Sequence, residues 1–381
     1  MFKLEKMISN KKKIIFVTAT RADFGKLKSL IKTLKNRKEF EIYIVVTGMH
    51  LSKRFGYTFN EVKKVFKTKI IKFKNQSIGD RLETILTKTS EKFSDIVSKI
   101  HPDLIVIHGD RVESLACGIV GSLNHILTAH IEGGEVSGTI DDTIRHAVTK
   151  LSHLHFVGST SAKKRIKNMG EINGHIYNIG SPDIDVIVRD RLPSISEVRK
   201  RYSIDFQDYS ILLWHPVTSR VNFLKYETNK VLNFLKKLEE KFIVIFPNND
   251  PGTKIITDSY KSLPKNKFKK LKSLRFEHFL TLLKNAKYII GNSSSAIYEA
   301  PILSTPAVNI GERQYKRIKS KAIKNFDVEK LNKQSLYNYL NNYKPPKKKY
   351  FGSGDSSKKF LKILLKKNFW RIPTQKFFSE S

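Results

Sequence analysis

The chain has 381 residues, of which 40% are hydrophobic and 28% charged, and its formal net charge is +36 at pH 7. This hydrophobic share excludes a disordered chain, and the length suffices for two core-bearing domains. The single cysteine, Cys117, excludes an internal disulfide framework. The N-terminal stretch lacks the long apolar segment of a signal peptide or a membrane span, so we expect a cytoplasmic protein with no membrane partner.

The positive charge comes mostly from lysines that are spread along the chain. No basic motif with interleaved aromatic residues, typical of RNA-binding proteins, is present. We therefore interpret most lysines as solvated surface residues and expect no nucleic-acid partner. A basic field still favours an anionic substrate such as a sugar nucleotide.

Five nearly continuous apolar runs in the first half predict strands that are buried on both faces of a parallel sheet. They span residues 13–18, 41–46, 103–108, 126–131 and 154–157. Between them, apolar side chains recur at helical spacing over residues 23–34, 85–100 and 112–123. Strands that alternate with helices in this way indicate an α/β fold with right-handed crossovers.

A more polar stretch at 194–209 interrupts this pattern, and we predict a linker there. Strand-like runs then resume at 210–216, 241–247, 287–292 and 306–311. The predicted fold is α/β, with two Rossmann-like doubly wound domains that face a cleft. The predicted boundaries are 1–193 for the first domain, 194–345 for the second, and 346–381 for a basic tail. A helix at 356–367 in that tail is expected to pack back on the first domain.

Polar side chains follow most of the predicted strands, as expected for an active site at the carboxyl edges of parallel sheets. Taken singly, each has a simpler explanation. Asp110 and the serines at 293–295 could simply cap helices, although a glycine and three serines that open a helix also suit a phosphate. A lone histidine such as His215 is more often structural than catalytic. Together these residues indicate an enzyme that acts on a phosphorylated, nucleotide-linked substrate.

The segment HIEGGEVSGTIDDTIRH at 130–146 gathers carboxylates in an otherwise basic chain. Clustered carboxylates raise one another's pKa, so that one can hold a proton while another stays ionised. Glycines in the segment would let its backbone approach a sugar closely. Two of its acidic residues, Glu135 and Asp142, we expect to be ordinary surface carboxylates.

No pattern of residues points to a metal or a cofactor. The sequence lacks a GxGxxG motif after the first strand and a GxxxxGK[ST] motif, which disfavours NAD chemistry and P-loop phosphoryl transfer. The histidines at 108, 130, 146, 153 and 155 have no metal-ligand spacing and are expected to lie in the core or in a cleft wall.

Several motifs, in this order, resemble the hydrolysing UDP-N-acetylglucosamine 2-epimerases, which start sialic acid and related nonulosonic acid pathways. They are TATRADFGK, HGDRVE, HIEGGEVSGTIDDTIRH, GSPDID, PNND, GNSSSAIYEAP and NIGERQYKR. The resemblance covers roughly residues 13–325 and implies the architecture of the B-type glycosyltransferases, GT-B. It also implies elimination of UDP through a 2-acetamidoglucal, followed by addition of water to give N-acetylmannosamine.

The resemblance assigns roles to individual positions. The catalytic residues it implies are Asp110, Glu132, Asp141 and His215. The substrate- and nucleotide-binding residues it implies are Arg21, Lys26, Arg111, Arg145, Asn248, Asn249, Ser293, Ser294, Glu299, Arg313 and Arg317. No metal or cofactor takes part in the implied reaction, and the implied assembly is a homodimer.

Other functions stay open at this point. Relatives in legionaminic acid synthesis act on GDP-2,4-diacetamido-2,4,6-trideoxyglucose, and the residues that would distinguish the two substrates cannot be identified from the sequence. A non-hydrolysing epimerase would keep UDP on the sugar. A glycosyltransferase of the GT-B type would need an acceptor site but no carboxylates around the sugar C2. Nucleic-acid binding ranks last, because only the net charge suggests it.

Overall fold

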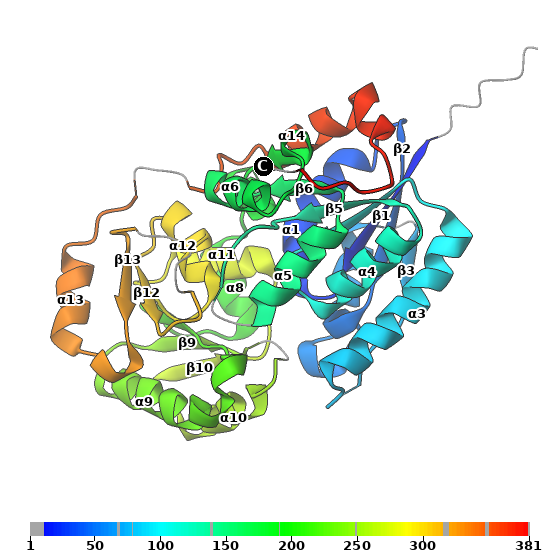
Figure 1. The fold of residues 1–381 in the computed structure, drawn as a ribbon. Coiled ribbons are helices and arrows are strands. Elements are labelled where there is room, and N and C mark those ends of the chain that lie inside the picture. Colours follow the sequence, from blue (N-terminus) through cyan, green and yellow to red (C-terminus); the bar gives the residue numbers. More distant parts are fainter. Residues whose placement is uncertain are drawn as a thin grey trace, which may run out of the picture. The chain divides into compact units, whose positions relative to one another are not determined.

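The computed structural model describes residues 11–66, 69–77, 79–137, 140–189, 191–247, 250–314, 320–346 and 350–379. The chain divides into two compact units, each with its own parallel sheet (Figure 1). The first unit contains the residues up to 134, residues 144–182 and the residues from 355 onward. The second contains residues 135–143 and 183–354.

The sheet of the first unit has seven parallel strands in the order β3-β2-β1-β4-β5-β6-β7. The strands are β1 (Lys12–Thr18), β2 (Phe40–Val46), β3 (Ile70–Lys72), β4 (Leu104–His108), β5 (Leu127–Ile131), β6 (Leu154–Val157) and β7 (Ile176–Asn178). Successive side chains of β1 point into different cores: Ile14 and Phe16 lie in one cluster, and Ile15 and Val17 in another. This explains the uninterrupted apolar sequence of the central strands, since both faces are buried.

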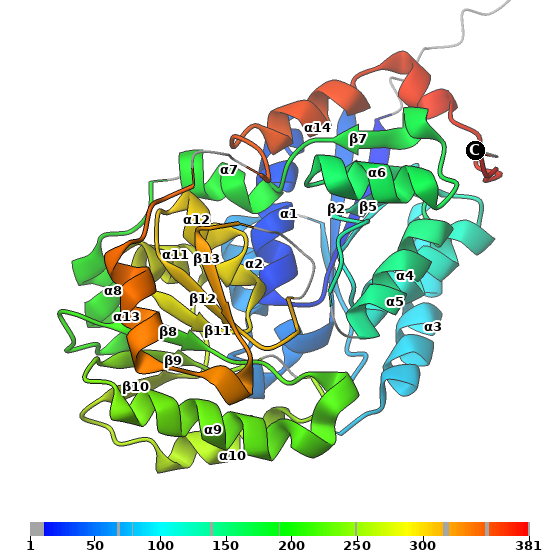
Figure 2. The ribbon, with the colours of Figure 1, turned by 60° about the vertical axis from the view of Figure 1, so that its left-hand side comes forward.

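Helices cover both faces of this sheet (Figure 2). The first core contains side chains of α1 (Arg21–Leu34), α2 (Phe59–Val65) and α14 (Ser356–Leu364). The second core contains those of α3 (Leu82–Ile100), α4 (Val112–Leu123) and α5 (Ile140–Leu151). Helix α6 (Thr160–Asn168) packs on β6 and β7. The arrangement is a doubly wound α/β sheet.

The second unit repeats this plan with six parallel strands in the order β10-β9-β8-β11-β12-β13. They are β8 (Ser210–Leu213), β9 (Phe242–Ile245), β10 (Phe268–Leu271), β11 (Ile289–Gly291), β12 (Ala307–Ile310) and β13 (Ile323–Phe326). One face packs against α7 (Pro182–Arg189), α8 (Ile195–Tyr202), α11 (Phe276–Lys284) and α12 (Glu299–Ile302). The other packs against α9 (Leu224–Lys237), α10 (Thr253–Ser259) and α13 (Lys333–Asn341).

Every strand predicted from the sequence is present, and so is the predicted doubly wound architecture of both halves. The sequence prediction omitted four strands, β3, β7, β10 and β13. Each of them is the outermost strand of its sheet. An edge strand has a neighbour on one side only, and its sequence carries a weaker apolar signal than that of a central strand.

The predicted linker at 194–209 contains a helix, since α8 occupies Ile195–Tyr202 and its Val198 is fully buried in the second unit's core. The expected final helix is α14, which is followed by a 3-10 helix at Lys367–Arg371. Phe360 of α14 packs on Phe156 with a ring-centroid distance of 4.7 Å. The chain passes between the units after residues 134, 143, 182 and 354.

The order of strands reverses at one place in each sheet. In the first unit β1 lies between β2 and β4, and in the second β8 lies between β9 and β11. Doubly wound sheets bind ligands at this switch point, outside the carboxyl ends of the strands. The ligand-binding residues of each unit are therefore expected at or shortly after these strand ends.

Across the described ranges, the helices are too short or too polar to traverse a lipid bilayer.

Candidate functional site

The turn between β1 and α1 fixes the carboxylate of Asp23. The Thr20 hydroxyl caps α1 by accepting a hydrogen bond from Asp23 N at 3.2 Å. Asp23 Oδ2 accepts in return from Thr20 N at 3.0 Å and from Ala19 N at 3.3 Å. This capping box uses one carboxylate oxygen and leaves Oδ1 directed toward the end of β4.

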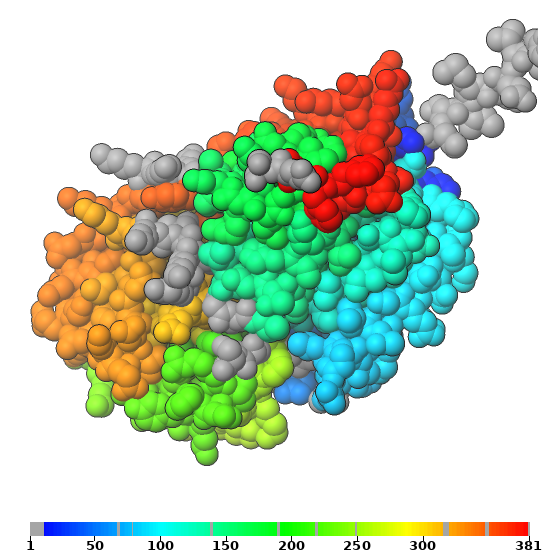
Figure 3. Space-filling view, viewed as in Figure 1, coloured from blue at the N-terminus to red at the C-terminus, as the bar shows by residue number. Residues whose placement is uncertain are grey.

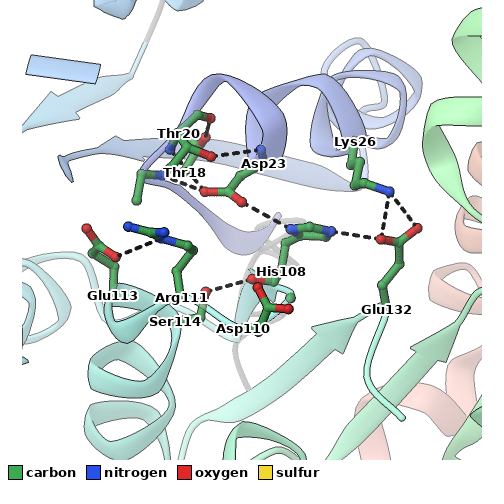
Figure 4. Close-up of polar contacts among 12 residues, drawn as sticks. Thr18, Thr20, Asp23, Lys26, His108, Asp110, Arg111, Glu113, Ser114 and Glu132 are labelled. Carbon is green, nitrogen blue, oxygen red and sulfur yellow. Dashed lines mark hydrogen bonds and ion pairs between the residues drawn. The ribbon is translucent and has the colours of Figure 1, made fainter. Parts of the chain in front are cut away.

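His108, the last residue of β4, lies between two carboxylates (Figure 4). Its Nδ1 is 3.3 Å from Asp23 Oδ1, and its Nε2 is 3.0 Å from Glu132 Oε2. Burial lowers the pKa of this imidazole, but the hydrogen bonds to Asp23 and Glu132 outweigh burial and raise the pKa to about 9. Both ring nitrogens therefore act as donors at neutral pH, and His108 is a buried cation.

Glu132 follows β5 with a φ of +59°, a left-handed conformation that few residues other than glycine adopt. Lys26 of α1 lies 2.8 Å from its Oε2 and 3.1 Å from its Oε1. The hydroxyl of Ser181 donates to Oε1 as well. Burial raises the pKa of Glu132, but the charges of Lys26 and His108 overcome this and hold the pKa well below its usual range.

Gly134 explains part of the glycine content of the carboxylate-rich segment. Its φ is +75°, and a Cβ at this position would lie 2.7 Å from the carbonyl oxygen of Ala162. That carbonyl oxygen belongs to α6, so the backbone after Glu132 approaches the helix too closely for any side chain. Arg165 of the same helix donates to the Gly134 carbonyl.

A second charged pair joins the end of β4 to α5. Asp110 follows Gly109, whose φ is +68°, and its carboxylate accepts from the guanidinium of Arg145. Arg145 is only 2% exposed. A buried guanidinium needs a counter-charge, so this pair fixes the position of the Asp110 carboxylate relative to α5.

Among the other carboxylates of the 130–146 segment, Glu135 differs from the sequence expectation. Glu135 is only 5% exposed, so the prediction that it is a surface carboxylate is wrong. Asp142 accepts hydrogen bonds from Ser137 N at 2.7 Å and from Ser137 Oγ at 3.2 Å. Asp141 lies in the first turn of α5, and its Oδ2 is 3.9 Å from Arg313 Nη2. The polar pattern of the segment therefore did not reveal the burial of Glu135.

Two predicted basic residues of the first unit lie outside the Lys26–Glu132 cluster. Arg21 binds Glu61 of α2, with distances of 2.7 Å from Nη2 to Oε1 and 3.2 Å from Nε to Oε2. Arg111 precedes α4, and its Nε is 3.8 Å from Glu113 Oε2. Arg21 and Lys26, predicted as a basic pair, thus have different carboxylate partners.

In the second unit, His215 lies just past the end of β8 and is 7% exposed. Asn292, just past β11, accepts from His215 N at 2.7 Å and donates to His215 O at 2.8 Å. Burial, together with the positive charge of Arg313, lowers the pKa of His215 to about 3, so the ring is neutral. Its buried Nδ1 has no hydrogen-bond partner among the described residues.

The serines after β11 form a shorter element than the sequence predicts. Ser293 caps a single 3-10 turn, Ser294–Ala296, and the next helix, α12, has four residues and starts at Glu299. Such a short helix has little dipole to attract a phosphate, so the start of α12 contributes less to phosphate binding than the sequence suggested. Arg313 Nη1 donates to the Asn292 carbonyl oxygen at 3.3 Å, which places it beside the same loop.

Three predicted binding residues, Asn248, Asn249 and Arg317, lie outside the described residues.

Sequence reasoning missed Asp23, His108 and Ser181 as site residues. Each stands in a motif that carries the family resemblance, within TATRADFGK, HGDRVE and GSPDID. Asp23 also stands at the third position after Thr20, as the acidic residue of a capping box does. The available signal was therefore their position at or near strand ends. Only the fold shows that His108 contacts both Asp23 and Glu132, and that Ser181 contacts Glu132.

Among the described residues, no group of three or more histidine, cysteine, aspartate and glutamate side chains is arranged to hold a metal ion. Cys117 is fully buried within the core of the first unit.

The model of the family described as UDP-N-acetylglucosamine 2-epimerase matches residues 32–365 of this chain. The chain belongs to this family. A UDP-N-acetylglucosamine 2-epimerase of Neisseria meningitidis serogroup B is 39% identical over 371 residues, which cover 96% of this chain and 98% of the relative. A GDP/UDP-N,N'-diacetylbacillosamine 2-epimerase (hydrolyzing) of Campylobacter jejuni is 34% identical, over 84% of this chain and 86% of the relative.

This member of the 2-epimerase family also shares its fold with solved structures. The UDP-N-acetylglucosamine 2-epimerase of Methanocaldococcus jannaschii, in complex with UDP-GlcNAc and UDP, superposes with a TM-score of 0.77 and 22% sequence identity. The match covers 92% of this chain and 99% of that chain. The GT-B-like fold predicted from the sequence is thereby confirmed.

Proposed function

We propose that this protein is a hydrolysing 2-epimerase that converts UDP-N-acetylglucosamine and water to N-acetylmannosamine and UDP. One observation carries this proposal: Asp110, His108 and Glu132 stand at the carboxyl ends of two adjacent strands, and Lys26 reaches Glu132 from α1. Paired carboxylates beside a basic residue suit the removal and return of a proton at carbon. Family membership supports the same reaction class.

In the first step, a carboxylate removes the C2 proton, a double bond forms between C1 and C2, and the C1–O bond breaks to release UDP. In the second, the oxygen of water adds to C1 and a proton returns to C2 from the opposite face. The sum is one substrate and one water in, and N-acetylmannosamine and UDP out. Two proton-carrying groups on opposite faces of the sugar are sufficient for inversion at C2.

The environments of the carboxylates support different roles. Asp110 is 28% exposed on its side chain and Asp141 30%, so both can meet a sugar from solvent. We assign the proton transfers to these two residues. Glu132 is 7% exposed and both of its oxygens already accept hydrogen bonds, so we assign it an orienting role.

His215 is proposed to assist the departure of the diphosphate. Its neutral ring can donate one hydrogen bond to a phosphate oxygen without adding a second full charge beside Arg313. Leaving the buried Nδ1 of His215 without a hydrogen bond costs free energy. A bound ligand would either form a hydrogen bond with Nδ1 or hold the ring so that Nε2 donates to the ligand. Ser293, Ser294, Glu299 and Arg313 remain proposed nucleotide contacts.

The test is a proton NMR time course in D2O with UDP-N-acetylglucosamine and no added metal. Free N-acetylmannosamine that carries deuterium at C2, together with released UDP, is the expected result. Asp110→Asn should reduce the rate by about a hundredfold or more, as loss of a general acid or base does. Asp80→Asn is the matched control, because Asp80 pairs with Lys88 at the surface.

Retention of UDP on a mixture of epimers would instead assign the protein to the non-hydrolysing class. Absence of turnover, or turnover unaffected by Asp110→Asn, would contradict the proposed chemistry.

A second substrate is favoured by the Campylobacter jejuni relative, whose name gives a diacetylbacillosamine linked to GDP or UDP. The same time course with the GDP- and UDP-linked forms of that sugar decides whether UDP-N-acetylglucosamine or a nucleotide-linked diacetylbacillosamine is the substrate. Hydrolysis of only the diacetylbacillosamine forms would keep the mechanism and change the substrate. Cytoplasmic location and a homodimer remain predictions.

A further inference from the structure

We propose that Asp23 and His108 form a positioning pair that keeps Glu132 ionised and in one orientation throughout the reaction, so that Glu132 carries no proton in either step. This inference rests on the proposed function and concerns a part of its site that the sequence did not reveal. Neither Asp23 nor His108 is assigned contact with the substrate.

The geometry forms a row of four charges that alternate in sign. Asp23 Oδ1 lies 3.3 Å from His108 Nδ1, His108 Nε2 lies 3.0 Å from Glu132 Oε2, and Lys26 Nζ lies 2.8 Å from the same oxygen. Figure 4 shows the row running from Asp23 through His108 to Glu132 and Lys26. With His108 protonated and Glu132 ionised, two carboxylates and two cations balance, and each charge faces one of opposite sign. Moving the proton from His108 to Glu132 would keep the sum at zero, but it would leave Asp23 facing a neutral imidazole and Lys26 facing a neutral carboxyl group.

The row is buried, which makes any change of charge costly. Asp23 is 7% exposed, His108 8% and Glu132 7%. A proton on Glu132 would leave Lys26 and His108 facing one carboxylate in a region poor in water, and an unpaired buried charge is strongly unfavourable. A carboxylate so constrained is a poor acceptor for a proton from carbon.

Asp23 itself cannot turn away from His108. Its Oδ2 is held by the backbone N–H groups of Ala19 and Thr20, which directly precede α1. The helix cap thus fixes one oxygen and presents the other to the imidazole. A histidine with an acceptor on each ring nitrogen has its ring orientation fixed as well, as in other carboxylate–histidine arrangements.

The charged and titratable groups that face His108 come from three elements. From α1 they are Asp23 and Lys26. From β5 and the residue after it they are the neutral His130 and Glu132. From the start of α4 it is Arg111, whose charge acts on Asp23. Because the pKa of His108 is raised to about 9, the row should stay intact at neutral pH. Its loss above about pH 9 should give the basic limb of the pH–rate profile.

The first measurement needs no substrate. The full chain is labelled with 15N in its histidines, and the imidazole nitrogens are observed by proton–nitrogen NMR, with His108 assigned by the signal lost in His108→Gln. Wild type should show two protonated ring nitrogens at neutral pH. In Asp23→Asn the imidazolium should deprotonate at a pH lower by about one unit or more, and Asp23→Glu should restore part of the shift.

The second measurement is kcat/KM as a function of pH for the same variants. The basic limb should move to lower pH in Asp23→Asn and remain in place in the control Asp80→Asn, which removes a partly exposed carboxylate that pairs with Lys88. A merely structural Asp23 would change the melting temperature without moving this limb. An unprotonated nitrogen on His108 at neutral pH in wild type would overturn the proposal, as would an unmoved limb in Asp23→Asn.

The two proposals can fail separately. Turnover of a nucleotide sugar with a neutral His108 would retain the proposed function and refute the positioning pair. A doubly protonated His108 in a protein that turns over neither substrate would refute the function and leave the charge row established.

Discussion

Asn292 holds His215 by both of its backbone polar groups, with hydrogen bonds of 2.7 Å from His215 N and 2.8 Å to His215 O. The two residues follow β8 and β11, the neighbouring strands at which the second sheet reverses its order. The position of the His215 ring therefore depends on the buried amide of Asn292, a residue to which no role was assigned from the sequence.

Asn292→Ala should reduce both activity and stability. The change leaves the backbone groups of His215 without partners in a buried place, which costs about 1–3 kcal/mol, and it releases the ring. Urea unfolding and kcat are the measurements. Asn285→Ala is the control, because among the described residues the side chain of Asn285, the cap at the end of α11, donates only to the Thr281 carbonyl. A fall in stability with unchanged kcat would show that His215 does not need this support.

Asp110 and Arg145 should behave as one unit in a double-mutant cycle. Arg145 is buried and its guanidinium binds Asp110, so Asp110→Asn leaves a buried cation with a weaker partner. The free energies of unfolding of Asp110→Asn, Arg145→Gln and the double variant should be non-additive by about 0.5–3 kcal/mol. Additive effects would mean that groups other than Asp110 stabilise the buried guanidinium of Arg145.

A buried cluster joins the C-terminal segment to the C-terminal end of α5. The space-filling view shows the C-terminal residues, in red, against the green surface of the first unit (Figure 3). Lys376 donates to the carbonyl oxygens of Lys150 at 2.6 Å and Ser152 at 2.7 Å, and lies 2.8 Å from Glu171. His155 Nε2 is 3.0 Å from the same Glu171 oxygen. Burial raises the pKa of Glu171, but His155 and Lys376 lower it to about 2.

Glu171 should therefore stabilise the fold in a pH-dependent way. Its folded pKa lies below the ordinary value of 4.5, so its contribution is complete above that value and is lost as the pH falls toward 2. Glu171→Gln should cost about 2 kcal/mol at neutral pH, and the difference from wild type should shrink below about pH 4. Urea unfolding across this range checks the sign, and a difference that grew at low pH would contradict it.

Gly134→Ala should be damaging where Gly174→Ala is not. The first combines a φ of +75° with a Cβ that would lie 2.7 Å from Ala162 O, whereas a Cβ on Gly174 meets nothing within 4 Å. The expected losses are more than about 1 kcal/mol for Gly134→Ala and less than about 0.5 kcal/mol for Gly174→Ala. Activity should fall with Gly134→Ala as well, because Glu132 lies two residues away. Equal stability of the two variants would show that the loop adapts.

The sequence predicted the strands that are buried on both faces and missed those at the edges. The run at 13–18 is apolar at nearly every position because both of its neighbours and both covering layers exclude water. The edge strand β10, with the sequence FKKL, carries two lysines at its centre. Burial on both faces requires apolar residues, and these make a strand recognisable in the sequence. An edge strand is less buried, so its sequence is less apolar.

The sequence alone determined the fold class, the family and the carboxylates that stand after the strands, because each depends on residues that are near one another in the chain. Tertiary structure alone decided that His108 is shared by Asp23 and Glu132, which are 85 and 24 residues away. It also decided that Glu135 is buried and that Arg21 binds Glu61 rather than lying beside Lys26. The ionisation of a group depends on the charges and the water around it, and folding sets these by bringing distant strand ends to one edge of a sheet.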